Sequence, residues 1–224
     1  MSAVFRRGSL IAIPLFLSGA DPVLKRAAPT LPAYASGLPI RWALPMAEDY
    51  LIGQVILDRV EALSREPDQE RLILLGIGAT DEASEKALRA DLEKLLVYVQ
   101  RYKRFRETGA VIYYDRDAEG AEKKNQATKT HLLTQIAKQG RTLVVPAFIG
   151  PKFDHSMALT AWLGKQFRGL NVAYREAELL PHPNVLLWLK KTANRYLTAR
   201  PSEIGVVIMP HGATQPWNDA VERV

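Results

Sequence analysis

Apolar residues follow two alternating patterns along this chain: short continuous runs, and longer stretches with a helical period. Near-continuous runs rich in β-branched residues predict buried strands, because a strand covered on both faces does not alternate with polar residues. Strands are predicted at 10–17, 71–75, 110–114, 142–149 and 204–209, and weaker ones at about 40–44 and 171–175.

Helical patterns separate these strands. One apolar stripe falls on a single helix face and follows acidic residues, which the helix dipole favours near an N-terminus. It comprises Leu88, Leu92, Leu95, Leu96, Val99 and Tyr102, after Asp81, Glu82 and Glu85. A second stripe follows the turn LLPHPN and comprises Val185, Trp188, Leu189, Thr192, Ala193 and Tyr196. The alternation predicts an α/β fold of mostly parallel sheets with helices on both faces, whose sites lie at the carboxyl ends of strands.

Self-comparison indicates an internal repeat. The segment LIAIPLFLSG (10–19) is echoed by TLVVPAFIGP (142–151), and ALPMAEDYLIGQVILDRV (43–60) by LLPHPNVLLWLKKTANRY (179–196). Separately, RLILLGIGATDEASEKAL (71–88) is echoed by GVVIMPHGATQPWNDAV (205–221). The matched pairs Pro14/Pro146 and Gly37/Gly169 are 132 residues apart, and the pair Gly78/Gly212 is 134 apart.

The repeat predicts tandem modules cut out of phase. Residues 8–66 are the second half of a first module, 71–198 a complete second module, and 204–224 the first strand and helix start of a further one. We therefore expect a fragment of a longer protein, with an exposed sheet edge that promotes self-association. A circular permutation, in which the two end pieces complete each other, is the alternative, but the last 21 residues are too few to supply a missing half-module.

Composition narrows the chemistry. The absence of cysteine excludes disulfides, thiolate metal sites and a cysteine nucleophile. A metal would have to be held by carboxylates and by the four histidines, which are His131, His155, His182 and His211. The net charge of +6 favours an anionic partner, but does not choose among nucleic acid, a membrane surface and a polycarboxylate small molecule.

The location follows from the apolar runs. None reaches the roughly 18 residues of a membrane-spanning helix, so no membrane partner is expected and a cytoplasmic location is predicted. The first 20 residues also imitate a secretory signal, with two arginines, an apolar stretch and then small residues, and a secreted or periplasmic protein is the alternative. The repeat favours a buried strand in this stretch.

The order of three motifs resembles one protein family. A strand ending in the turn HGA, a strand of the form VVP-x-F and a later PHP turn are similar to the sirohydrochlorin chelatases of the CbiX type, and PHGATQPWNDAV resembles the first-strand signature of their two-module members. The resemblance implies chelatase-like tandem modules and a lyase of siroheme or cobalamin biosynthesis. It would insert divalent cobalt or iron, as a substrate, into sirohydrochlorin or a related tetrapyrrole.

The resemblance also implies metal-binding and catalytic residues. His211 occupies the family's ligand position in the HG turn, and His155 is the best match to the histidine after the VVP-x-F strand. Ile77 replaces the first-strand ligand of the complete module, and Pro22 takes the position of His155 in the first half-module. Each unit thus keeps at most one ligand, which leaves open a degenerate, non-catalytic module that binds metal or tetrapyrrole.

Structural explanations compete at several of these residues. His211 could serve a turn, and His155 could lie at a helix N-terminus beside Asp154. His182, between two prolines, is expected to form a rigid turn that opens the last helix, and His131 to lie on the solvated surface.

The stretch VYVQRYKRFRE (97–107) interleaves cations with Tyr98, Tyr102 and Phe105. It could bind nucleic acid or an acidic partner. We favour the end of an amphipathic helix with core-facing aromatics, so nucleic acid is not the expected partner.

Overall fold

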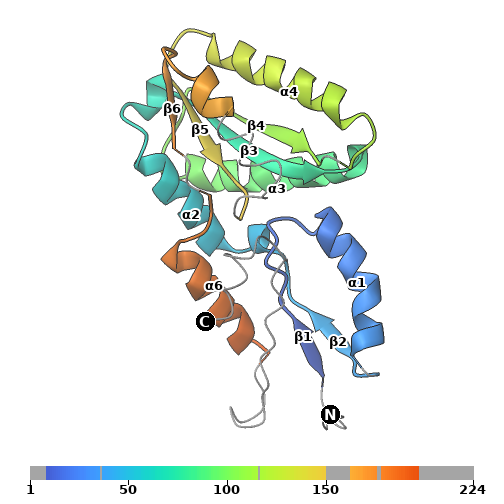
Figure 1. The fold of residues 1–224 in the computed structure, drawn as a ribbon. Helices are drawn as coiled ribbons and strands as arrows, with labels where there is room; N and C mark the ends of the chain where they lie inside the picture. The colour runs from blue at the N-terminus through green and yellow to red at the C-terminus, as the bar shows by residue number, and fades with distance from the viewer. Residues whose placement is uncertain (1–8, 36, 116, 150–161, 176–177, 197–224) are drawn as a thin grey trace.

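The computed structural model describes residues 9–35, 37–115, 117–149, 162–175 and 178–196, which form two parallel sheets and their covering helices (Figure 1). The strands are β1 (Leu10–Ala12), β2 (Ile40–Trp42), β3 (Arg71–Ala79), β4 (Glu107–Tyr114), β5 (Thr142–Pro146) and β6 (Val172–Tyr174). The helices are α1 (Pro22–Tyr34), α2 (Tyr50–Glu61), α3 (Glu82–Gln100), α4 (Ala121–Ile136) and α6 (Pro183–Asn194), with 3₁₀ turns η1 (Met46–Glu48) and η2 (Pro67–Gln69). Within these ranges no helix combines the length and apolar character needed to cross a membrane.

The large sheet has the strand order β4-β3-β5-β6, and all its pairings are parallel. Strand β3 lies at its centre, and every residue from Arg71 to Gly76 is buried. Leu72 and Leu74 pack with α2 and α3 on one face, whereas Ile73 and Leu75 pack with α4 on the other. Residues 162–166 are helical and place Leu163 on the α4 face. The predicted α/β fold with helices on both faces is therefore confirmed.

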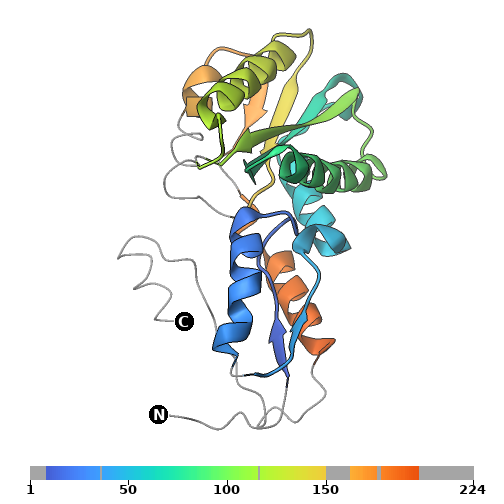
Figure 2. The ribbon, with the colours of Figure 1, turned by 90° about the vertical axis from the view of Figure 1, so that its right-hand side faces the viewer.

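The small sheet consists of β1 and β2, paired in parallel from Leu10↔Ile40 to Ala12↔Trp42. Helices α1 and α6 lie on its two sides (Figure 2). Strand β1 ends at Ala12 and is shorter than the run 10–17 predicted, since Pro14 has no N–H for a ladder. The residues beyond it turn toward η1, where the backbone N–H of Met46 and Ala47 donate to the carbonyl oxygens of Phe16 and Leu17.

Two segments of the chain share one order of elements. Residues 10–61 run β1, α1, β2, α2, and residues 142–194 run β5, the helical segment 162–166, β6, α6. Gly37 (φ 79°) and Gly169 (φ 77°) precede β2 and β6 in the left-handed region, which glycine adopts readily. The internal repeat of tandem modules stays a prediction beside this shared order of elements.

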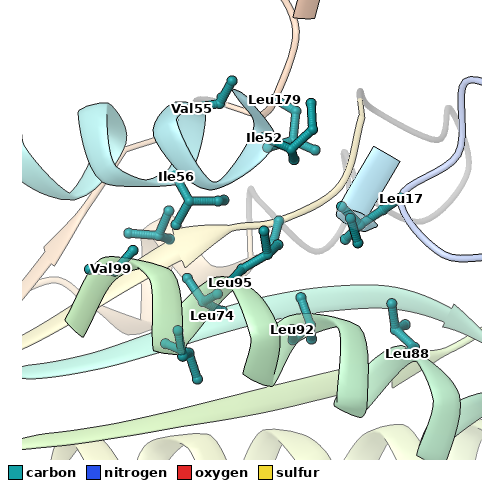
Figure 3. Packing of buried hydrophobic residues seen from close by; sticks show 14 of the residues in the cluster. Leu17, Ile52, Val55, Ile56, Leu74, Leu88, Leu92, Leu95, Val99 and Leu179 are labelled. Atoms are coloured by element: carbon teal, nitrogen blue, oxygen red, sulfur yellow. The ribbon is translucent and has the colours of Figure 1, made fainter. Parts of the chain in front are cut away.

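Helix α2 follows the small sheet in sequence but packs against the large one. Ile52, Val55 and Ile56 are fully buried in one cluster with Leu74 of β3 and Leu92 and Leu95 of α3 (Figure 3). Gly53 makes the closest approach, because a Cβ built there would lie 2.6 Å from Cγ of Tyr98 on α3. The helix that follows the small sheet therefore belongs to the core of the large one.

Helices α2 and α6 lie antiparallel, and the N-cap residue of each contacts a charged side chain of the other. Asp49, the N-cap of α2, accepts hydrogen bonds from Nζ of Lys191 on α6 at 2.8 and 3.1 Å. His182, the N-cap of α6, places Nε2 3.3 Å from Oδ2 of Asp58 on α2. Lys191 and Asp58 occupy the same position along their helices, the ninth residue. The two contacts are therefore related by a local two-fold axis, with an acidic N-cap and a basic partner in one and a histidine N-cap and an acidic partner in the other.

Helix α3 begins where the sequence predicts but ends before the last residue of the predicted apolar stripe. Asp81 and Ser84 form the capping box at its start, and Leu88, Leu92, Leu95, Leu96 and Val99 are buried as predicted. Tyr102 is an exception. The helix ends at Gln100, and Tyr102 is 62% exposed and contacts the ring of Tyr98 at 5.2 Å instead of joining the core.

We expect Gly53→Ala to destabilise the protein by roughly 1–3 kcal/mol through overpacking against Tyr98, although alanine is the better helix former. Thermal unfolding checks this, with about 2–4 °C lost per kcal/mol for a chain of this size. In a Tyr98→Ala background the same substitution should raise stability. Equal destabilisation in both backgrounds would contradict the close contact.

Candidate functional site: the carboxyl edge of the large sheet

The carboxyl end of β3 faces the loop that follows β1. Leu17, from this loop, is buried in the same cluster as Ala79 at the end of β3 and Leu88 of α3 (Figure 3). Lys25 of α1 lies close enough to Asp81 for its charge to lower the pKa of that carboxyl. Side chains from both sheets therefore meet at this edge, where open α/β folds place their sites.

Asp81 is occupied by its role as a helix cap. Its Oδ1 accepts from the backbone N–H of Ser84 at 2.7 Å, and the Ser84 hydroxyl accepts from the backbone N–H of Asp81 at 3.0 Å. Hydrogen bonds to the carboxylate from the backbone N–H and the hydroxyl of Ser84 are the main reason that the pKa of Asp81 is lowered, with the charge of Lys25 a smaller cause. The carboxylate is therefore ionised and held in place.

A second carboxylate, that of Glu85, lies at the end of β4. Tyr114 donates from Oη to Oε2 of Glu85 at 2.5 Å, and Arg89 donates to Oε1 at 2.7 Å. Lys124 of α4 places Nζ 4.5 Å from the centre of the Tyr114 ring. Burial alone would raise the pKa of Glu85, but the hydrogen bonds from Tyr114 and Arg89 leave it lowered. Burial and the bond to Glu85 raise the pKa of Tyr114 to about 12.

This cluster of Glu85, Arg89, Tyr114 and Lys124 offers fixed cations and an ionised carboxylate. A carboxylate with a lowered pKa is a weak proton acceptor, so Glu85 is better suited to orienting Arg89 than to taking protons. Sequence reasoning identified Glu85 only as a favourable helix residue. The i,i+4 spacing of Glu85 and Arg89 and a tyrosine at a strand end were the available signals.

The predicted ligands His155 and His211 lie outside the described residues. The other two histidines have the structural roles that the sequence predicted. His131 is exposed on α4. His182 opens α6, where Nδ1 accepts from the backbone N–H of Asn184 at 3.2 Å.

The two positions predicted to have lost a ligand both serve the fold. Ile77 packs against the cluster on the α4 face of the large sheet. Pro22 is the first residue of α1 and follows the N-cap Asp21, whose side chain accepts from the N–H of Val23 at 2.9 Å. Among the described residues, no group of three or more His, Asp or Glu side chains could hold a metal ion.

The basic stretch 101–106 does not form a stacking platform. Phe105 is 7% exposed, and Tyr98 is half-buried with its hydroxyl 3.2 Å from Oε1 of Gln54. Lys103 pairs with Glu61 at 3.7 Å. Of the three aromatic rings only Tyr102 is exposed, which argues against binding single-stranded nucleic acid here.

Two solved structures share this fold. SirB from Bacillus subtilis with Fe3+ matches with a TM-score of 0.58 and 14% sequence identity, over 84% of this chain and 72% of that one. The sirohydrochlorin chelatase SirB from Bacillus subtilis subspecies spizizenii in complex with cobalt matches with a TM-score of 0.56 at the same identity and coverage. No family model and no curated protein sequence matches the chain. The chain has a SirB-like chelatase fold.

We expect the stability of the protein to fall with His182 protonation. Burial lowers the pKa of His182, an effect that the charge of Asp58 offsets only in part and that of Arg59 reinforces. The neutral imidazole, which caps α6, is thus favoured on folding. Its contribution is complete above the unfolded value of about 6.5 and is lost as pH falls through the lower folded value.

His182→Asn keeps a capping side chain without this titration. Chemical denaturation between about pH 7 and 5 should show wild type losing stability relative to this variant. His131→Asn, on the exposed face of α4, is the matched control and should follow wild type. Parallel pH profiles for wild type and His182→Asn would refute the assignment.

Proposed function

We propose that this protein is a chelatase-like protein that binds a polycarboxylate tetrapyrrole of the sirohydrochlorin class and inserts divalent cobalt or iron into it. The SirB-like fold is the observation that carries the proposal, since two structures of that fold are a complex with Fe3+ and one with cobalt. The internal repeat would make residues 8–66, 71–198 and 204–224 parts of successive chelatase-like modules.

Charge at the carboxyl edge suits an acidic macrocycle. Lys25, Arg89 and Lys124 lie there, and the whole chain carries a net charge of +6. Cations of this kind can bind the peripheral carboxylates of a tetrapyrrole through charge-assisted hydrogen bonds. The aromatic ring of Tyr114 adds an apolar surface beside Lys124.

Metal insertion displaces two protons from the pyrrole nitrogens, and these need an acceptor. Glu85 and Asp81 both have lowered pKa values and fixed hydrogen-bond partners, so neither is a good base near neutral pH. An imidazole titrates near pH 6.5 and serves better. We therefore assign both proton transfer and transient metal binding to His211 and His155.

A non-catalytic binding module is the second candidate. Ile77 is partly buried and packs against the α4-side cluster, and Pro22 begins α1, so both positions are committed to the fold. Such a module would hold the metal or the tetrapyrrole without turnover. Appearance of the metallated macrocycle in an absorbance assay separates the two candidates.

We expect His155→Ala and His211→Ala each to weaken Co2+ binding about tenfold or more, because two imidazoles are the main ligands. Isothermal titration of the full chain measures this, with His131→Ala as the control that keeps wild-type affinity. Affinity should also fade as pH drops through roughly 6.5, because protons compete for the same nitrogens. Wild-type affinity in both ligand variants would remove the basis for the assignment.

A further inference from the structure

A groove of about 510 Å³ runs along the outer edge of the large sheet. It lies between the second half of α3 and the beginning of β4. Its lining includes Glu93 and Val97 of α3, Arg101 directly after that helix, and Thr108, Gly109 and Ala110 of β4. Val97 is 55% exposed on its wall. Strand β4 is the last strand on this side of the sheet, so one row of its backbone groups faces outward.

Side chains cover the end of this edge. Asn125 both accepts from the backbone N–H of Tyr114 (2.7 Å) and donates to its carbonyl oxygen (3.0 Å), and Thr128 donates to the carbonyl oxygen of Ile112 at 3.2 Å. Arg89 donates to the carbonyl oxygen of Ala110 at 3.0 Å. Residues 110, 112 and 114 therefore face outward, whereas Asp115 donates its N–H to Ala79 of β3.

The beginning of the edge is open. By the same alternation Thr108 also faces outward, and within the described residues no side chain bonds its N–H, its carbonyl oxygen or the N–H of Ala110. Proteins usually cover such groups, because an open strand edge pairs with another strand. The covered half and the open half of β4 thus define where a partner strand can bind.

Charges on α3 make the groove complementary to itself. Glu93, Val97 and Arg101 follow one another at four-residue spacing along a single stripe. Val97 is midway between the two charges, so an antiparallel copy of α3 centred on Val97 brings Glu93 against Arg101 twice. Neither side chain has a hydrogen-bond or ion-pair partner in the described part of the chain. Two-fold interfaces have this reciprocal form.

We propose that the groove binds a second copy of this chain. The two β4 strands pair antiparallel about Gly109, so that Thr108 of each copy lies opposite Ala110 of the other and a continuous eight-stranded sheet forms from two four-stranded ones. The Ala110 N–H of each copy donates to the Thr108 carbonyl oxygen of the other. The Thr108 N–H donates to the Ala110 carbonyl oxygen, which has a second lone pair for its bond from Arg89. Gly109 suits this contact because no atom of the described residues lies within 4 Å of a Cβ built there. The two α3 helices then pack side by side through Val97, with both Glu93–Arg101 pairs formed.

Sedimentation velocity of the full chain over a range of concentrations tests the proposal. Wild type should dimerise, with a dissociation constant that rises with salt. Glu93→Arg and Arg101→Glu should each weaken the dimer tenfold or more, and the double reversal Glu93→Arg/Arg101→Glu should restore it. Glu122→Arg, an exposed reversal on α4, is the control that leaves the dimer unchanged.

A second pair of variants probes the strands. Thr108→Pro removes an outward N–H that the folded chain does not use and should abolish the dimer, whereas Thr108→Val keeps the N–H and should preserve it. A chain that stays monomeric at every concentration overturns self-pairing and leaves an extended peptide as the occupant. A dimer that withstands both charge reversals and Thr108→Pro assigns association to another surface. If each single reversal weakens the dimer but the double reversal does not restore it, the reciprocal Glu93–Arg101 contact is overturned.

Discussion

The packing of α2 against the large sheet is the constraint on which the rest of the structure depends. The helix follows β2 in sequence, yet Ile52, Val55, Ile56 and Val60 are fully buried, in the core shared with β3 and α3. Burying four such side chains contributes on the order of 6–12 kcal/mol, as much as the net stability of a typical domain. Since α2 is covalently attached to the small sheet, that sheet is held against the large one. Helix α6 makes the reciprocal connection, and the caps at Asp49 and His182 fix how the two helices align.

The sequence predicted the class of fold well because two of its signals are local. Continuous apolar runs mark strands covered on both faces, and the six described strands all lie within or beside such runs. Asp81 with the stripe from Leu88 to Val99 marks α3. Periodicity gives the buried face of a helix but not the partner of that face, so the docking of α2 on the large sheet could not be derived. The ends of strands and helices were predicted less accurately, because the apolar pattern does not stop where the backbone hydrogen bonds stop. Hydrophobicity continues through Pro14 and Tyr102, whereas the hydrogen-bond ladders stop at Ala12 and Gln100.

The strand ends at the carboxyl edge could be predicted from the sequence, but the side chains that interact there could not. Strand ends at a topological edge identify where a site lies, and Ala79, Asp81 and Tyr114 are found there. Which side chains interact there depends on the register of β3 with β4, which pairs Ala79 with Tyr114 and brings α3 over the end of β4. The bond between Glu85 and Tyr114 is a consequence of that register, and residues 29 positions apart carry no local signal of it. Histidine, by contrast, is conspicuous in a sequence whether or not it contributes to a site, as the structural roles of His131 and His182 illustrate.

The two functional surfaces proposed for this chain are compatible because they use opposite ends of one strand. Asn125 and Thr128 cover the carboxyl half of β4, whereas Arg89 bonds Ala110 and also holds Glu85 at the carboxyl edge. Asn125 and Thr128 therefore prevent a partner strand from extending toward the candidate site. Pairing about Gly109 is confined to the amino half, and the antiparallel arrangement directs the carboxyl edges of the two copies away from each other. Neither copy would cover the carboxyl edge of the other, so association and ligand binding need not compete.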